Sequence, residues 1–183
     1  MNTTYIDILQ YADELIQQNG FNGFSYADLS KKLGIKKASI HHHFPTKADL
    51  GIAYCQQKSD ALSELQQQLS MKKTARAQLQ GYFSVFDDCA ELGGMCGIFS
   101  MQTDLKLLSA ELQKQVNKLV QLELQILSGV LLKGLTTGEF RFNGAPEQQA
   151  VIICCAIKGA LMLNRNQQGL YKQTCDACLD IIS

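Results

Sequence analysis

The sequence contains little of what β-sheets, secreted proteins and membrane proteins usually contain. Its 183 residues include only two prolines, Pro45 and Pro146, and no stretch of useful length alternates apolar and polar residues as a strand would. The N-terminus does not read as a signal peptide, and the longest apolar run, residues 150–163, is short for a membrane span and is interrupted by Lys158. These absences predict an all-α protein of the cytoplasm with no membrane partner.

Neither an excess of charge nor a regular cysteine pattern is present. Lysine plus arginine and aspartate plus glutamate each number 17, so the net charge is zero and any contact with DNA must be local. The seven cysteines are odd in number and irregularly spaced, which argues against a disulfide framework and for a reducing compartment. The sequence has no Gly-rich phosphate loop, no HExxH and no nucleophile elbow, so we expect no enzyme and no cofactor.

One stretch, LSKKLGIKKASIHHHFPTKADL from Leu29 to Leu50, has the pattern of a helix-turn-helix followed by the start of a long helix. Gly34 stands where a helix end favours positive φ, and a short second helix then runs to about His43. Pro45 cannot continue that helix, and Thr46 is a good N-cap for the next one.

Charge in this stretch is one-sided, because residues 29–48 hold five lysines, all three histidines and no carboxylate. A DNA backbone attracts such a surface, although a solvated lysine face on an ordinary helical hairpin explains the charge equally well. His41, His42 and His43 are adjacent and would point about 100° apart on a helix, so we expect no metal site here.

The order of residues is more specific than their charge. Gly20-Phe21, Phe24-Ser25, Leu33-Gly34-Ile35, Lys37-Ala38-Ser39-Ile40 and above all HHHFPTKADL resemble the DNA-binding domain of the TetR family of bacterial transcriptional regulators, over roughly residues 3–50. The resemblance implies that the second helix of the pair enters the major groove. It also implies DNA contacts at Ser25, Tyr26, Lys36, Lys37, Ala38, Ser39, His41 and His42, with Lys47 holding a phosphate. The family usually has a bulky aromatic residue where this chain has His41 or His42, which leaves the base preference open.

Apolar periodicity predicts about nine helices in two domains. A three-helix module over residues 3–44 is expected to belong to a DNA-binding domain of residues 1–46. An effector-binding and dimerisation domain, residues 47–183, is expected to follow as a helical bundle. Its helices are predicted at about residues 47–69, 74–92, 98–108, 110–135, 146–166 and 170–182. This layout is also the one that the TetR resemblance implies.

Residues 81–105 contain no lysine or arginine and are rich in phenylalanine, methionine and cysteine, which suits an apolar or electrophilic effector better than a polyanion. Cys96 lies in a Gly-rich turn before a helix, and Lys158 is the one charge in the apolar centre of a later helix. A nearby ammonium would make Cys96 more reactive, although Cys96 could equally be a small packing residue. The expected pocket residues are Tyr82, Phe83, Phe86, Met95, Cys96, Phe99 and Lys158. The chain also resembles, more loosely, a branch of the family that senses electrophiles through one cysteine in this region.

Small and apolar residues recur at helical spacing near the C-terminus. Ile152, Cys155, Gly159 and Met162, together with Leu170 and Leu179, predict a helical interface between two copies of the chain, as the family forms, unless these faces close the chain's own core. Cys154-Cys155 and the lone Cys175–Cys178 pair suit helix packing better than redox or metal chemistry.

These expectations converge on a homodimeric repressor that binds double-stranded DNA at a palindromic operator and is released by a small apolar or electrophilic effector. One alternative is a TetR-like DNA-binding protein without an inducer, acting by occupancy or through a protein partner. Another is an α-helical binding protein or enzyme that has lost DNA function, which the intact Lys36–Lys37 surface disfavours.

Overall fold

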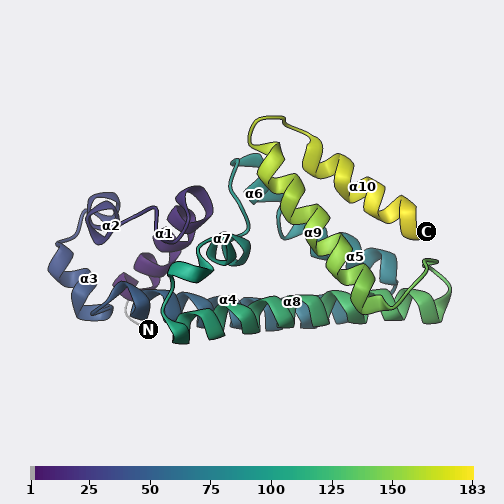
Figure 1. The fold of residues 1–183 in the computed structure, drawn as a ribbon, viewed down its shortest axis with the longest axis horizontal. Coiled ribbons are helices and arrows are strands. Elements are labelled where there is room, and N and C mark those ends of the chain that lie inside the picture. The colour runs from purple at the N-terminus through teal and green to yellow at the C-terminus, as the bar shows by residue number, and fades with distance from the viewer. Residues whose placement is uncertain (1–2) are drawn as a thin grey trace. The chain divides into compact units, whose positions relative to one another are not determined.

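The structure is a computed structural model that describes residues 3–183, and within them every regular element is helical. Ten α-helices, α1 to α10, and one short 3-10 helix follow one another along the chain (Figure 1). They are α1 Thr3–Asn19, α2 Tyr26–Leu33, α3 Lys37–His43, α4 Lys47–Ser70, α5 Ala75–Ser84, α6 Asp87–Glu91, α7 Gly97–Thr103, the 3-10 helix Leu105–Leu107, α8 Ala110–Thr137, α9 Pro146–Asn164 and α10 Leu170–Ile182. The all-α prediction is confirmed.

The chain divides into two compact units that differ from the two expected domains. Within the described residues, unit 1 comprises residues 3–59 and 97–119, and unit 2 comprises residues 60–96 and 120–183. Two long helices, α4 and α8, therefore contribute to both units. The functional boundary at residues 46/47 stays a prediction, and the first two residues of the expected DNA-binding domain lie outside the described residues.

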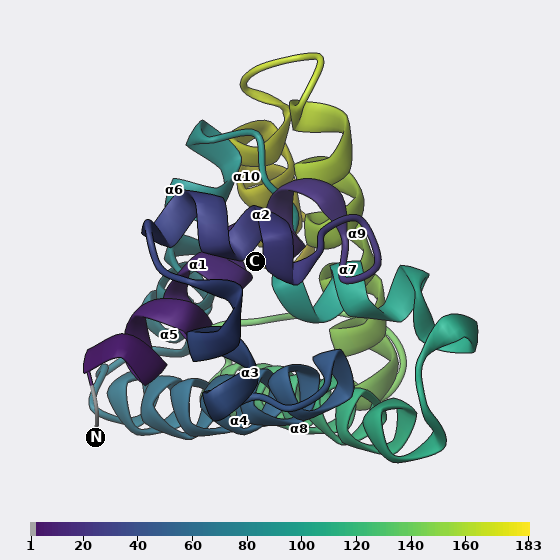
Figure 2. The same ribbon diagram turned by 90° about the vertical axis from the view of Figure 1, so that its left-hand side faces the viewer.

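Unit 1 is held together by an apolar core that α1, α2, α3 and α4 share. Its fully buried side chains include Ile8, Ile16, Leu29, Ile40 and Leu50. Helices α1 and α2 lie side by side in both views (Figures 1 and 2). Helix α7 also packs on α1, where the Ser100 hydroxyl donates a 2.8 Å hydrogen bond to the Ile16 carbonyl. This core fixes the orientation of α3, which buries only Ile40.

The predicted helix over residues 74–92 is two helices in the structure. The Thr74 hydroxyl accepts a hydrogen bond from the Ala77 amide and caps α5, which ends at Ser84. Phe86 then leaves the helical conformation at φ −105° and ψ 3°, and α6 begins at Asp87. No glycine or proline marks this break, so the sequence carried no ordinary stop signal for it.

Unit 2 packs α5, α6, α9, α10 and the later part of α8 around large buried side chains. Helices α9 and α10 lie side by side, in yellow-green and yellow in Figure 1. The core includes Leu79, Tyr82, Leu127, Phe140 and Ile157. Gly134 allows the Phe140 ring to approach closely, because a Cβ there would lie 1.9 Å from the ring.

Helix α8 extends two residues beyond the helix predicted over residues 110–135. By length and composition alone it could cross a membrane. The core helix of a soluble protein passes the same test, and α8 buries Leu112, Val116, Leu127 and Leu131 in the described structure.

Candidate functional site

The start of α2 and the turn after it are fixed by local interactions that the sequence indicated. The Ser25 side chain caps α2, and the Asp28 carboxylate accepts hydrogen bonds from the Ser25 amide and hydroxyl at 2.7 and 2.8 Å. These hydrogen bonds from Ser25 lower the pKa of Asp28. Gly34 ends α2 at φ 66°, a conformation that costs a residue with a Cβ more than it costs glycine. The helix-turn-helix geometry of residues 26–43 follows from these contacts.

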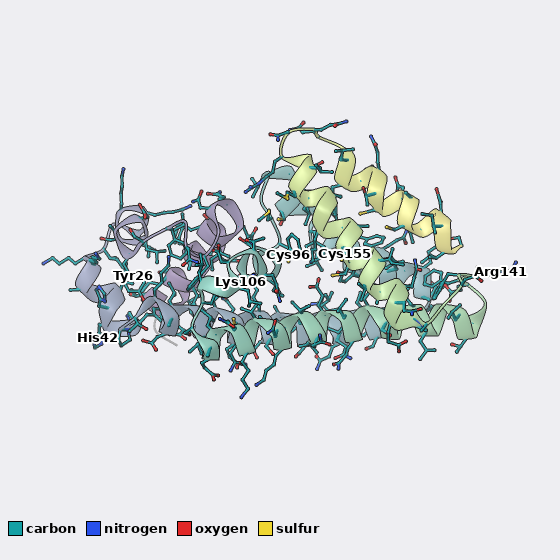
Figure 3. All side chains as sticks on the ribbon, in the orientation of Figure 1. Tyr26, His42, Cys96, Lys106, Arg141 and Cys155 are labelled. Carbon is teal, nitrogen blue, oxygen red and sulfur yellow. The ribbon has the colours of Figure 1, made fainter. Side chains whose placement is uncertain are left out.

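Tyr26, predicted to contact DNA, lies in the core of unit 1 with 6% of its surface exposed. Its hydroxyl donates to the carbonyls of Phe44 at 3.0 Å and Thr46 at 2.6 Å, and so joins α2 to the turn after α3 (Figure 3). Burial, aided by the Asp49 carboxylate, raises the pKa of Tyr26 to about 12. The hydroxyl therefore has a structural use that the sequence did not reveal.

Helix α3 presents most of the other predicted DNA contacts to solvent. Lys36, Lys37, Ala38, His41 and His42 are exposed, whereas Ser39 is half-buried. The Nδ1 atom of His41 lies 3.2 Å from the Pro45 carbonyl oxygen, and its ring packs edge-on against Tyr26 at 4.9 Å. His42 carries no such contact with the tyrosine and is labelled on α3 in Figure 3. A short, exposed, basic helix of this kind has the size and charge to enter the DNA major groove.

Lys47, predicted to hold a phosphate, is half-buried at the start of α4. Its ammonium donates to the Phe24 carbonyl and lies over the Phe24 and Phe21 rings, 4.1 and 5.0 Å from their centroids. Burial lowers the pKa of Lys47, although the carboxylates of Asp104 and Asp28 partly oppose that shift. Replacing Lys47 would consequently disturb packing in unit 1 as well as any phosphate contact.

A buried polar cluster in unit 2 brings together Lys158 and Cys96, which the sequence analysis had paired. The Lys158 ammonium lies 3.2 Å from the Cys96 sulfur and 3.7 Å from the centroid of the Phe86 ring. Only 2% of the Lys158 side chain is exposed. Burial disfavours its charge, but the attraction of Cys96 and Glu123 outweighs burial and raises the pKa of Lys158 above its usual range. Figure 3 labels Cys96, which directly precedes α7.

Glu123 completes this cluster and was missed by the sequence analysis. Its Oε1 atom accepts a 2.6 Å hydrogen bond from Lys158 and a 2.8 Å hydrogen bond from the Tyr82 hydroxyl. Burial first, and then the Glu123 charge, raises the pKa of Tyr82 well above its usual range. A signal for Glu123 existed, because it lies four residues from both Leu119 and Leu127 and therefore falls within the apolar stripe of α8.

The predicted pocket residues are only partly gathered by the structure. Five belong to or adjoin the cluster in unit 2: Tyr82, Phe83, Phe86, Cys96 and Lys158. Met95 is half-buried beside Cys96 in the chain, and Phe99 lies on α7 in unit 1. A separate groove of about 720 Å³ runs between α5, α6 and α10, and Phe83 is the predicted pocket residue that lines it. Within residues 3–183, no group of three or more His, Cys, Asp or Glu side chains could hold a metal ion.

The predicted dimer residues divide between the surface and the core of unit 2. Ile152 and Met162 on α9 are 60% and 56% exposed, Cys155 is exposed (Figure 3), and Gly159 is half-buried between them. Val151 and Leu163 extend this exposed apolar face. On α10, Leu170 is half-buried and Leu179 is buried within the chain, so Leu179 packs against its own unit.

The exposed basic helix of unit 1, fixed by a capped helix-turn-helix, defines a DNA-binding transcriptional regulator. Residues 8–54 match the family model described as "Bacterial regulatory proteins, tetR family". This match places residues 8–54 with the TetR family of bacterial regulators, and the chain as a whole is similar to transcriptional regulators of that family.

Three known proteins illustrate the likeness. A TetR-family transcriptional regulator from Agrobacterium tumefaciens has 27% sequence identity, and the match covers 99% of this chain and 98% of that one with a TM-score of 0.91. A TetR transcriptional regulator from Legionella pneumophila has 28% identity, with 100% and 98% coverage and a TM-score of 0.88. The "Fatty acid metabolism regulator protein" of Bacillus subtilis strain 168 is 25% identical over 142 residues, which are 75% of this chain and 71% of that protein.

Proposed function

We propose that this chain is a homodimeric repressor of the bacterial cytoplasm that leaves a palindromic operator when Cys96 reacts with an electrophile or oxidant. The protein acts through DNA occupancy and carries out no catalysis of its own. The observation that carries the effector assignment is the 3.2 Å contact between the Cys96 sulfur and the Lys158 ammonium.

A palindromic operator follows from the size of α3. Seven residues with one buried anchor can read only a few base pairs, so specific binding requires two copies about one helical turn of DNA apart, roughly 34 Å. The exposed apolar face of α9 offers a surface for the second copy. Ile152, Cys155, Gly159 and Met162 recur there at three- and four-residue spacing, and small residues allow two helices to approach closely.

An electrophilic effector follows from the chemistry of the buried cluster. The thiolate is the reactive form of cysteine, and the neighbouring Lys158 ammonium can stabilise the thiolate that forms as Cys96 reacts. Addition to an α,β-unsaturated carbonyl forms a bond between Cys96 Sγ and the β-carbon. The displaced π electrons move to the carbonyl oxygen, and a proton then reaches the α-carbon. A polyanionic effector is disfavoured, because Glu123 already pairs with Lys158.

One observation favours the alternative of a regulator without an inducer. Every fully buried side-chain nitrogen or oxygen of the described residues has a hydrogen-bond partner, as a purely structural cluster would require. The two functions differ in what a thiol reagent does to the complex with DNA.

The test uses operator DNA obtained by genomic selection, with N-ethylmaleimide as the electrophile and hypochlorite as the oxidant. Cys96→Ser should bind the operator with unchanged affinity and resist release by either reagent, as followed by fluorescence anisotropy. Cys89→Ser is the matched control, since it removes another buried thiol from the same unit. Normal release of the Cys96→Ser protein would reject the thiol switch, and failure of the wild type to respond would favour the regulator without an inducer.

A further inference from the structure

The cluster around Cys96 contains one cation and two groups that can be its counter-ion. Lys158 contacts the Cys96 sulfur at 3.2 Å and Glu123 Oε1 at 2.6 Å. Lys158 and Glu123 are the only buried charged side chains among residues 3–183, with 2% and 3% of their surfaces exposed. Because burying an excess charge is costly, one ammonium can balance only one anion at this site.

Ordinary acidities decide which group carries the negative charge. A glutamic acid releases its proton at a pH about four units below that at which a thiol does. In a cluster of three groups with one positive charge, the carboxylate therefore forms in preference to the thiolate by a factor on the order of 10⁴ before local effects. The Tyr82 hydroxyl favours the same outcome, since it donates a 2.8 Å hydrogen bond to Glu123.

We propose that Glu123 holds the charge of Lys158 and keeps Cys96 in the thiol form, so that Glu123 sets how reactive an effector must be to modify Cys96. This inference rests on the proposed function, in which Cys96 is the reactive residue. Glu123 is a positioning residue here, because it acts on Cys96 through Lys158.

The remaining titratable group near the cluster does not supply a further anion. Cys154 lies one helical turn before Lys158 on α9, near the Tyr82 hydroxyl. Burial raises the pKa of Cys154 to about 12, so it stays a neutral thiol. Lys158 is left as the one positive charge for which Cys96 and Glu123 compete.

Removing the negative charge of Glu123 should therefore leave the Lys158 ammonium free to pair with Cys96. An amine binds its proton more tightly than a thiol does, by about two pH units, so a Lys–Cys pair without the carboxylate settles as ammonium and thiolate. A thiol of ordinary acidity is about 3% thiolate at pH 7, so full conversion of Cys96 to the thiolate raises its reactive fraction by at least about 30-fold. Since a stabilised thiolate is also a weaker nucleophile, we expect about a tenfold rise in rate.

The experiment measures the rate at which N-ethylmaleimide labels Cys96 at pH 7 in the intact protein, by quantitative peptide mass spectrometry. Glu123→Gln should label Cys96 about tenfold faster than the wild type. Cys155, which is exposed in the single chain and lies on the proposed dimer face, gives an internal reference rate in the same sample when all proteins are compared at one concentration. Cys55 reports unfolding, because it is buried in unit 1 and burial raises its pKa to about 12.

Three further variants separate an electrostatic role from a structural one. Glu123→Asp restores the charge and should return the rate toward the wild-type value. Lys158→Met combined with Glu123→Gln should cancel the gain, because the effect passes through Lys158. Tyr82→Phe removes one hydrogen bond from the carboxylate and should raise the rate about two- to tenfold. If the Glu123→Gln protein unfolds, so that Cys55 becomes labelled, the Tyr82→Phe protein still tests the inference.

The outcomes distinguish this inference from the proposed function. A Glu123→Gln rate at Cys96 equal to or below the wild-type rate, with Cys155 unchanged, would overturn the inference alone. If Cys96 stays unlabelled in both proteins while Cys155 reacts, the thiol switch itself fails and the inference fails with it. Release of the Glu123→Gln protein from DNA at about one tenth of the wild-type reagent concentration would support both.

Discussion

Replacing Lys158 by methionine should destabilise unit 2 in a manner that depends on pH. Methionine has nearly the length of lysine but carries no charge, so the variant leaves Glu123 buried with only the Tyr82 hydroxyl as a partner. Removing one member of a buried ion pair typically costs about 3–5 kcal/mol. The side chains of Lys158 and Glu123 are 2% and 4% exposed, so solvent screening should reduce this cost little.

The pH dependence gives a second, independent value for the loss of stability in Lys158→Met. To remain buried without Lys158, the Glu123 carboxyl must take up a proton, which an ordinary glutamic acid binds only below about pH 4.3. The folded variant then binds more protons than the unfolded chain, so its stability falls as pH rises, by about 1.36 kcal/mol per unit. Between pH 4.3 and pH 7 the loss reaches about 3.7 kcal/mol, in agreement with the range for a broken buried pair.

The assay is urea denaturation followed by circular dichroism at pH 5, 6 and 7. Protein concentration is held fixed, because dimer formation would add a concentration-dependent term. Lys158→Met combined with Glu123→Gln is the matched control: it should regain most of the lost stability and show a flat pH profile. If Lys158→Met lowers the free energy of unfolding by less than about 1 kcal/mol at every pH, the buried-pair reasoning is refuted. The same holds if the losses of Lys158→Met and Glu123→Gln, measured separately, simply add in the double variant.

Three further predictions concern the other surfaces. Tyr26→Phe should lower the free energy of unfolding, measured by urea denaturation, by about 1–2 kcal/mol, because the hydrogen bonds of the hydroxyl are lost. Since the pKa of Tyr26 in the folded protein is raised to about 12, the stabilisation by this hydroxyl is complete below about pH 10 and is lost as the pH rises toward 12. Lys37→Ala should weaken operator binding and lower the slope of log affinity against log salt by about one, whereas the exposed Lys73→Ala should leave both unchanged in anisotropy titrations. Ile152→Glu should yield monomers in sedimentation velocity, while Val85→Glu, which is similarly exposed outside α9, should not. A dimeric Ile152→Glu protein would place the interface elsewhere.

Local signals in the sequence predicted the helix-turn-helix well. Gly34 and Ser25 determine where α2 ends and begins through their own backbone and side-chain chemistry, so neighbours in the chain are sufficient to infer them. The break at Phe86 was missed for the opposite reason. Residues 74–92 keep a helical apolar pattern throughout, and near the break the Phe83 carbonyl accepts a hydrogen bond from the hydroxyl of Tyr171, 88 residues away in the sequence.

Side-chain roles that depend on distant partners were harder to infer. Tyr26 was read as a DNA contact by resemblance, but its hydroxyl is directed to carbonyls 18 and 20 residues away. The Lys158–Cys96 pair spans 62 residues and was still anticipated, because Lys158 is the one charge in the apolar centre of its helix. The same reasoning applied to Glu123 in α8 would have predicted the third member of the cluster.

If Cys96 is the switch as proposed, its position in the chain gives a route by which a change at its sulfur can act on unit 1, which carries the predicted DNA contacts. Cys96 is the last residue of that segment of unit 2, and the next residue, Gly97, begins α7 in unit 1. Gly97 is packed so closely that a Cβ would lie 1.8 Å from the Tyr54 hydroxyl, which donates to Asp13 on α1. A covalent adduct on Cys96 must displace either the side chains of its buried cluster or its own backbone. Because α7 is tied to α1 at Gly97 and Ser100, backbone movement at residue 96 acts on the helix that supports α2 and α3.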